Sequence, residues 1–86
     1  MEVTVELNPE CKKVELFGSA DSNLRMVRKE LGVNLTARAD SVRISGDEEN
    51  VEAAVQIINK MQDYVLRYSA ISPDKVRDFL QQDTQT

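Results

Sequence analysis

The residues of this sequence best suited to chemistry are a small loop and the positive charges that follow it. The stretch FGSADSN, residues 17–23, is led by Gly18, which leaves the backbone open to close approach. Arg25, Arg28 and Lys29 come soon after it, and residues 18–45 carry five basic and three acidic side chains, an excess of two positive charges. The stretch is therefore a candidate for contact with a nucleic-acid backbone.

Most enzymatic chemistry is excluded by what the sequence lacks. There is no histidine and Cys11 is the single cysteine, which excludes thiolate zinc clusters, an intrachain disulfide and Ser-His catalysis. A P-loop ends in Gly-Lys-Ser/Thr, but the three glycines of this sequence are followed by Ser19, Val33 and Asp47, so this sequence contains no P-loop. The carboxylates of residues 47–49 suit the positive end of a helix. We expect no catalytic residue, no metal site and no cofactor, so this segment is not expected to be an enzyme.

The composition predicts one folded domain with little attraction for polyanions. Hydrophobic residues make up 41% and charged residues 30% of the 86 residues, a globular balance that suffices for a single core. The apolar runs are too short for a membrane span and MEVTVEL does not resemble a signal peptide, so we expect no membrane partner and a cytoplasmic location. The net charge of −4 and a pI near 4.7 predict weak non-specific binding to nucleic acid.

The first part of the chain predicts a strand and a short helix. Apolar and polar residues alternate over residues 2–7, as in a strand with one buried face. Residues 8–10, Asn-Pro-Glu, have the features of a helix start, so we expect a helix from there to Gly18 with Cys11, Val14 and Phe17 on its inner face. A competing interpretation makes residues 12–17 a strand in a hairpin with the first, because apolar residues alternate there too.

The middle of the chain predicts a second helix and two antiparallel strands. Leu24, Val27 and Leu31 recur at helical spacing, and Gly32 is placed to end the helix in a left-handed turn. Alternating residues then predict strands at 33–38 and 41–45, joined by a turn at residues 39–40.

The last part of the chain predicts two helices. A long helix is expected to follow Asp47 and to end near Tyr68, and a shorter one begins at residues 72–73. We expect one domain over residues 1–68, an appended helix over 69–82 and a frayed tail over 83–86. The predicted core comprises Val5, Leu7, Val14, Leu24, Val27, Leu31, Leu35, Val42, Ile44, Val51, Ala54, Val55 and Ile58, with Met61, Val65, Val76, Phe79 and Leu80 also inward.

The predicted element order is α+β and resembles the K-homology (KH) fold of type I. That fold has the order β-α-α-β-β-α, a three-stranded antiparallel sheet with helices on one face, and an extra C-terminal helix is expected here. The resemblance rests on Gly18 at the end of the first helix, LGVNL before the second strand and VRISGDEENVEAA from the third strand into the long helix. More narrowly, LFG, LGV, ISGDEENVE and SPDKVRDFL resemble the N-terminal domain of PhoH-like, phosphate-starvation-inducible P-loop ATPases, over about residues 3–80.

The resemblance implies a role for the loop between the first two helices. In KH domains a Gly-x-x-Gly loop grips the backbone of four single-stranded nucleotides. On that pattern Gly18 is the first glycine, whereas Asp21 stands where the second should be and would repel a phosphate. The residues favour a plainer role for Asp21, as the side-chain cap of a helix that begins at Ser22. The candidate nucleic-acid contacts are Gly18, Ser19, Ala20, Asp21, Asn23, Arg25, Arg28 and Lys29.

Two functions remain open at this point. In the first, the segment is a non-catalytic accessory domain that contacts single-stranded RNA weakly and serves the ATPase domain that the resemblance places downstream. In the second, it is a protein–protein or oligomerisation module that docks to that ATPase domain or to other copies and binds no nucleic acid. The basic residues then form only a solvated helix face and ordinary strand exteriors.

Overall fold

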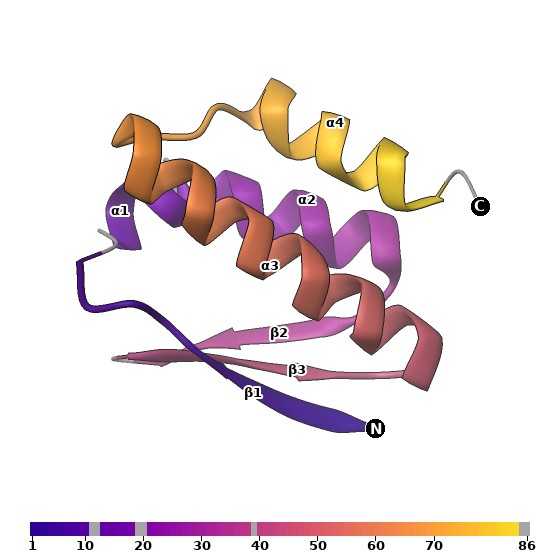
Figure 1. Cartoon of the computed structure of the whole chain (residues 1–86). Helices are drawn as coiled ribbons and strands as arrows, with labels where there is room; N and C mark the ends of the chain where they lie inside the picture. The colour runs from indigo at the N-terminus through magenta and orange to yellow at the C-terminus, as the bar shows by residue number, and fades with distance from the viewer. Residues whose placement is uncertain (11–12, 19–20, 39, 85–86) are drawn as a thin grey trace.

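A computed structural model describes residues 1–10, 13–18, 21–38 and 40–84. These residues form three strands and four helices (Figure 1). In chain order they are β1 (Glu2–Glu6), α1 (Lys13–Phe17), α2 (Ser22–Leu31), β2 (Asn34–Ala37), β3 (Ser41–Ser45), α3 (Glu48–Tyr68) and α4 (Pro73–Thr84). None of the helices in the described part of the chain combines the length and the apolar character needed to cross a membrane.

The sheet has β3 in the middle, paired antiparallel with β1 on one side and β2 on the other. In this register Ile44 pairs with Val3 of β1 and with Leu35 of β2. The helices cover one face of the sheet (Figure 1), so Val5, Val42 and Ile44 on that face are buried. The residues that alternate with them are more exposed, as expected for the opposite face. The predicted KH-like fold, with helices on one face and an additional C-terminal helix, is confirmed.

The core lies between the sheet and the helical layer. Most of the residues predicted to be inward are buried, although Leu35, Val55 and Phe79 are only partly so. The side chain of Val14 is not among those that the structure describes. Leu16 and Ile57 are fully buried and were not predicted. α4 packs against both α2 and α3, so its inward residues join the same core.

The predicted start of α1 is wrong. The described helix begins at Lys13, and the Oδ1 atom of Asn8 accepts a hydrogen bond from the backbone N–H of Glu10 at 2.9 Å. Asn8 therefore stabilises a local turn two residues on, in place of capping a helix. Cys11, which was expected on the inner face, lies outside the described residues. The alternative strand over residues 12–17 is also wrong, since residues 13–17 are helical.

The remaining boundaries agree with prediction to within two residues. β1 ends at Glu6 and β2 covers residues 34–37, each shorter than predicted. α2 ends at Leu31 and is capped, as predicted, by Gly32 in the left-handed conformation (φ 64°), and α3 ends at Tyr68. Arg38 donates its N–H to the carbonyl oxygen of Ser41 at 2.7 Å across the predicted turn, of which residue 39 lies outside the described residues. α4 continues to residue 84, past the predicted end at 82.

Candidate nucleic-acid interface

Two left-handed residues flank the loop between α1 and α2. Gly18 follows α1 with φ 80°, and Asp21 precedes α2 with φ 59°. The N–H of Asp21 donates to the carbonyl oxygen of Gly18 at 3.2 Å, which closes the loop on itself. Ser19 and Ala20 lie outside the described residues. Both ends of the tetrapeptide thus adopt a backbone conformation that glycine adopts most readily, although only the first is glycine.

Asp21 occupies the position before α2 but does not cap it with its side chain. The carboxylate of Asp21 accepts no capping hydrogen bond from the backbone N–H groups of α2, so the predicted cap is wrong. The physical reason is its backbone conformation. Capping side chains usually belong to a residue with extended φ and ψ, whereas Asp21 is left-handed at φ 59°, ψ 30°. Aspartate tolerates this conformation better than most residues. The exposed carboxylate thus remains beside the N-terminus of α2.

Glycine is favoured at position 18 by its positive φ and by the side chains of α2 that pass close to it. A Cβ atom at this position would lie 2.8 Å from Oγ of Ser22 and 3.1 Å from the side-chain amide of Asn23. The positive φ adds backbone strain for any residue with a side chain. The sequence singled out Gly18 for phosphate contact, and the structure gives it a packing role as well.

Asn23 lies inside the molecule, although the sequence placed it among the candidate contacts. Its side chain is fully buried, and Nδ2 donates to the carbonyl oxygens of Leu16 at 3.1 Å and Ile71 at 3.4 Å. Asn23 therefore ties the end of α1 and the α3–α4 connection to the first turn of α2. It holds the loop in place and has no side-chain surface to offer a ligand.

A groove lies between α2 and β2 next to this loop. Its volume is about 210 Å³, and it is lined by Asp21, Leu24, Arg25, Arg28, Leu35 and Ala37. The structure therefore brings three of the predicted contact residues together, two of them cationic. Lys29 is exposed on the same helix but does not line the groove.

The floor of the groove was not predicted from the sequence. Leu35 was assigned to the core, and Ala37 alternates with it along β2. Both are incompletely buried, because β2 is an edge strand and α2 covers it only in part. Incomplete burial of an edge strand depends on tertiary packing, so alternation alone could not reveal it.

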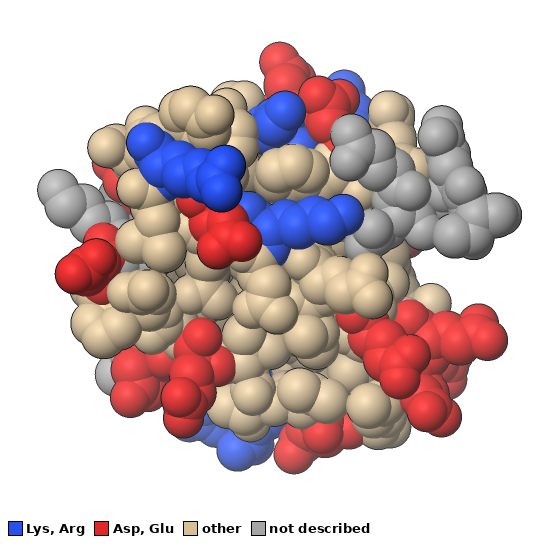
Figure 2. All heavy atoms as spheres, viewed as in Figure 1, with Lys and Arg blue, Asp and Glu red and all other residues tan. Residues whose placement is uncertain are grey.

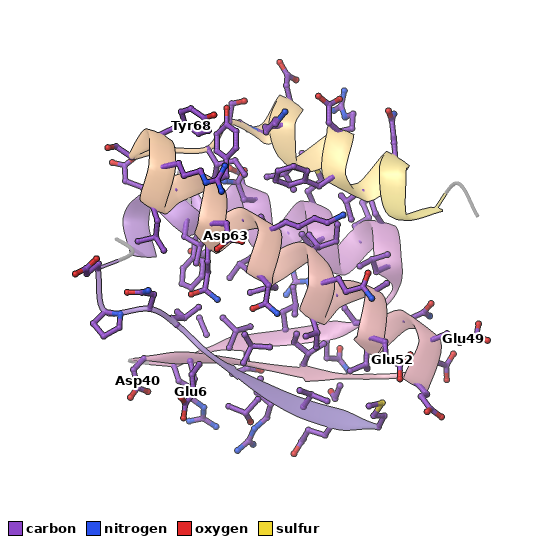
Figure 3. The ribbon with its side chains drawn as sticks, viewed as in Figure 1. Glu6, Asp40, Glu49, Glu52, Asp63 and Tyr68 are labelled. Atoms are coloured by element: carbon purple, nitrogen blue, oxygen red, sulfur yellow. The ribbon has the colours of Figure 1, made fainter. Side chains whose placement is uncertain are left out.

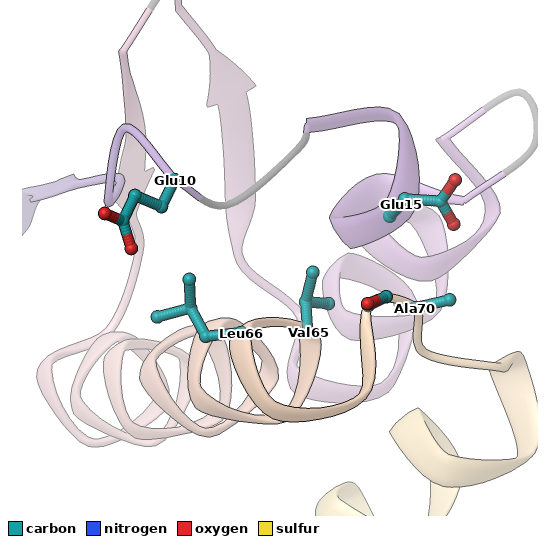
Figure 4. Close-up of a pocket in the computed structure, with 6 residues that line it drawn as sticks. Glu10, Glu15, Val65, Leu66 and Ala70 are labelled. Carbon is teal, nitrogen blue, oxygen red and sulfur yellow. The ribbon is translucent and has the colours of Figure 1, made fainter.

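A second cavity lies between the segment that follows β1 and the end of α3 (Figure 4). It measures about 470 Å³ and is lined by Glu10, Glu15, Val65, Leu66, Ser69 and Ala70. Glu10 and Glu15 approach it from different segments and do not converge on one point (Figure 4). Within the described ranges, no three His, Cys, Asp or Glu side chains are placed to hold a metal ion.

The chain is similar to curated proteins that carry the name PhoH-like protein. It is 32% identical over 54 residues to one from Bacillus subtilis, which covers 63% of this chain and 17% of that protein. It is 33% identical over 64 residues to one from Mycobacterium tuberculosis (74% of this chain, 18% of that protein) and 32% identical over 74 residues to one from Mycobacterium leprae (86% and 21%). The chain thus matches about a fifth of the length of these relatives. No family model matches the sequence.

Proposed function

Because this chain is related to a segment of PhoH-like proteins, we propose that it is a non-catalytic, KH-like accessory domain that makes weak contact with single-stranded RNA. In the whole protein it would serve an ATPase domain. The observation that carries the proposal is the groove between α2 and β2, where Arg25 and Arg28 lie beside a loop with two left-handed ends. Such a groove offers cations to phosphates and an apolar floor to one or two bases.

The same groove predicts that binding is weak. Asp21 places a carboxylate where a phosphate would approach, which leaves the lining with two cations and one anion. No aromatic ring lines the groove, so bases gain little stacking energy there. The net charge of −4 opposes long-range attraction. We expect dissociation constants no tighter than roughly 10⁻⁴ to 10⁻⁶ M at physiological salt.

The test is to titrate labelled single-stranded RNA into the unaltered chain and three variants at low and moderate salt. Asp21→Gly removes the repelling carboxylate and should tighten binding about fivefold, equivalent to about 1 kcal/mol for a unit charge pair at short range in water. Arg28→Glu should weaken binding strongly, because it replaces a cation of the groove with an anion. Lys29→Glu is the matched control, because it makes the same charge change one residue away and outside the groove. Its effect should be several times smaller.

Two results would contradict the proposal. Equal losses of RNA affinity for Arg28→Glu and Lys29→Glu would mean that binding depends on the charge of α2 and not on the groove. Tight, sequence-specific binding that Asp21→Gly leaves unchanged would mean that the loop is a complete clamp as it stands.

A second candidate function is assembly, and one observation favours it. The exposed carboxylate of Asp21 at the end of the loop would repel a phosphate, which favours a role that needs no phosphate contact. In that case the domain would dock to the ATPase domain of its own protein or to other copies. Sedimentation of the chain over a range of concentrations tests whether it associates with other copies of itself. Self-association together with no RNA binding by any variant would favour assembly.

A further inference from the structure

Three of the four aromatic rings of the chain meet between α3 and α4. The ring centroids of Tyr64 and Tyr68 lie 4.6 Å apart with the planes tilted by 45°, and Phe79 meets Tyr64 edge-on at 6.1 Å. Tyr64 and Phe79 are partly buried in the seam between the helices, whereas Tyr68 is 64% exposed at the end of α3 that leads into α4 (Figure 3). Packing of the seam accounts for the first two rings, whereas most of the surface of Tyr68 is exposed.

Positive charges surround these rings. The rings line a cavity of about 360 Å³ together with Lys60, Arg67 and Lys75, against the single carboxylate of Asp63. Nζ of Lys75 lies 5.5 Å from the centroids of both Tyr64 and Phe79, a cation–π arrangement. Figure 2 shows basic side chains over α3 and α4 on this face, with acidic side chains among them. The residues that line this cavity thus carry a net charge of +2, on a chain whose net charge is −4.

We propose that this aromatic–cationic face, formed by Tyr64, Tyr68, Phe79, Arg67 and Lys75, stacks a base of single-stranded nucleic acid. The base would lie on the exposed ring of Tyr68, and Arg67 and Lys75 would meet the flanking phosphates. Exposed rings next to cations form the usual platform for single strands, since every base has a face that can stack. An acidic peptide would pair with the cations but has no base to stack on an exposed ring.

This inference rests on the proposed function and adds what the α2–β2 groove lacks. That groove has cations and no aromatic ring, whereas this face has three rings. The two sites share no lining residue, so each can be removed without touching the other. The RNA would then contact the domain at two places, each of them weak.

The chain contains a built-in reporter for this face. It has no tryptophan and only two tyrosines, Tyr64 and Tyr68, both of which lie here. Intrinsic tyrosine emission therefore reports on the aromatic–cationic face and not on the α2–β2 groove. We expect a single-stranded oligouridylate to quench this emission, and an abasic strand of the same length, which has phosphates but no bases, to leave it nearly unchanged.

Variants on one helix provide the matched comparison. Tyr68→Ala should weaken RNA binding at least about fivefold, the lower end of the effect of removing a stacking ring. Tyr68→Trp keeps a ring and should bind as well as the unaltered chain or better. Leu66→Ala is the control, since Leu66 is 40% exposed two residues earlier on α3 and does not line this cavity. Its binding should stay unchanged.

The outcomes separate this inference from the groove. If RNA binds without quenching and only Arg28→Glu weakens it, the α2–β2 groove stands and base stacking on Tyr68 is refuted. If Tyr68→Ala weakens binding while Arg28→Glu and Asp21→Gly have no effect, the stacking face stands and the groove does not. If the abasic strand or an oligoglutamate peptide binds as tightly as RNA, the face recognises acidic partners by charge and the proposal is overturned.

Discussion

Replacing Asn23 with aspartate tests how the loop is held in place. The Asn23 side chain is 0% exposed, and its Nδ2 atom lies 3.1 Å from the carbonyl oxygen of Leu16 and 3.4 Å from that of Ile71. Its Oδ1 atom has no hydrogen-bond partner among the described residues. Aspartate has almost the same shape, but when ionised it offers only acceptors to these two carbonyl oxygens.

The size of the effect follows from these contacts. Each hydrogen bond contributes about 1 kcal/mol, with the longer one at the low end, and an ionised carboxylate buried without a donor costs several kcal/mol more. A protonated carboxyl can still donate to Leu16. We expect a loss of about 1 kcal/mol when the carboxyl is protonated and of about 4 kcal/mol or more when it is ionised. An 86-residue domain is stable by about 4 to 13 kcal/mol, so the second loss is large.

The loss should depend on pH with a definite sign. Burial against two carbonyl oxygens raises the pKa of the introduced carboxyl above its unfolded value of about 3.9. The destabilisation is therefore smallest below that value and grows as the pH rises, by up to about 1.4 kcal/mol per pH unit, until the pH passes the folded-state pKa. Urea unfolding of Asn23→Asp and of the unaltered chain between pH 4 and pH 7 measures the difference.

Asn23→Leu is the control for this experiment. It removes both hydrogen bonds in a side chain of similar size and adds no titrating group, so its loss should not vary with pH. A difference between the aspartate variant and the unaltered chain that is also constant over this range would refute the buried position of Asn23.

Three further predictions concern stability and are checked by urea unfolding. Ile58→Ala should lower the free energy of unfolding by about 2 to 5 kcal/mol, because the Ile58 side chain is 0% exposed. A loss of less than about half a kcal/mol would mean that this face of α3 is not buried. Glu52→Ala, on the exposed side of α3, is the control. Gly18→Ala should lose at least about 1 kcal/mol, because its Cβ would meet Ser22 at 2.8 Å at a φ of +80°, and unchanged stability would contradict that close approach. Asp21→Gly should change the free energy of unfolding by less than about 1 kcal/mol, because relief of the left-handed backbone strain offsets the loss of a negative charge at the start of α2. A larger loss would mean that the side chain of Asp21 does cap the helix.

Local periodicity was enough to predict most elements. Val42 and Ile44 alternate with polar residues in β3, and α3 shows a helical stripe after an acidic start, so these elements follow from neighbours in sequence. The predicted start of α1 was wrong because residues 8–10 suit two different local structures. Asparagine before Pro-Glu suits a helix cap and also suits the turn that Asn8 makes with Glu10.

Buried polar residues were the part that the sequence could not place. Asparagine and glutamine usually lie at the surface, yet Asn23 and Gln62 are both buried. Their partners are distant, since Asn23 donates to Ile71, 48 residues away, and Gln62 accepts from the N–H of Asn8, 54 residues away. The same limit applies to the candidate site. Arg25 and Arg28 were identified by charge, but the groove that they line exists only once β2 lies beside α2.

The central position of β3 has a consequence for the order in which the sheet is built. β1 and β2 each pair with β3 and not with each other, and β3 is the last strand along the chain. During synthesis at about 5 to 20 residues per second, β1 waits about 2 to 8 seconds between residue 6 and residue 45 for its partner. The β2–β3 hairpin has the shorter loop to close and can form first. The N-terminal strand is then the last to join the sheet, and until it does so β3 keeps an open edge on that side.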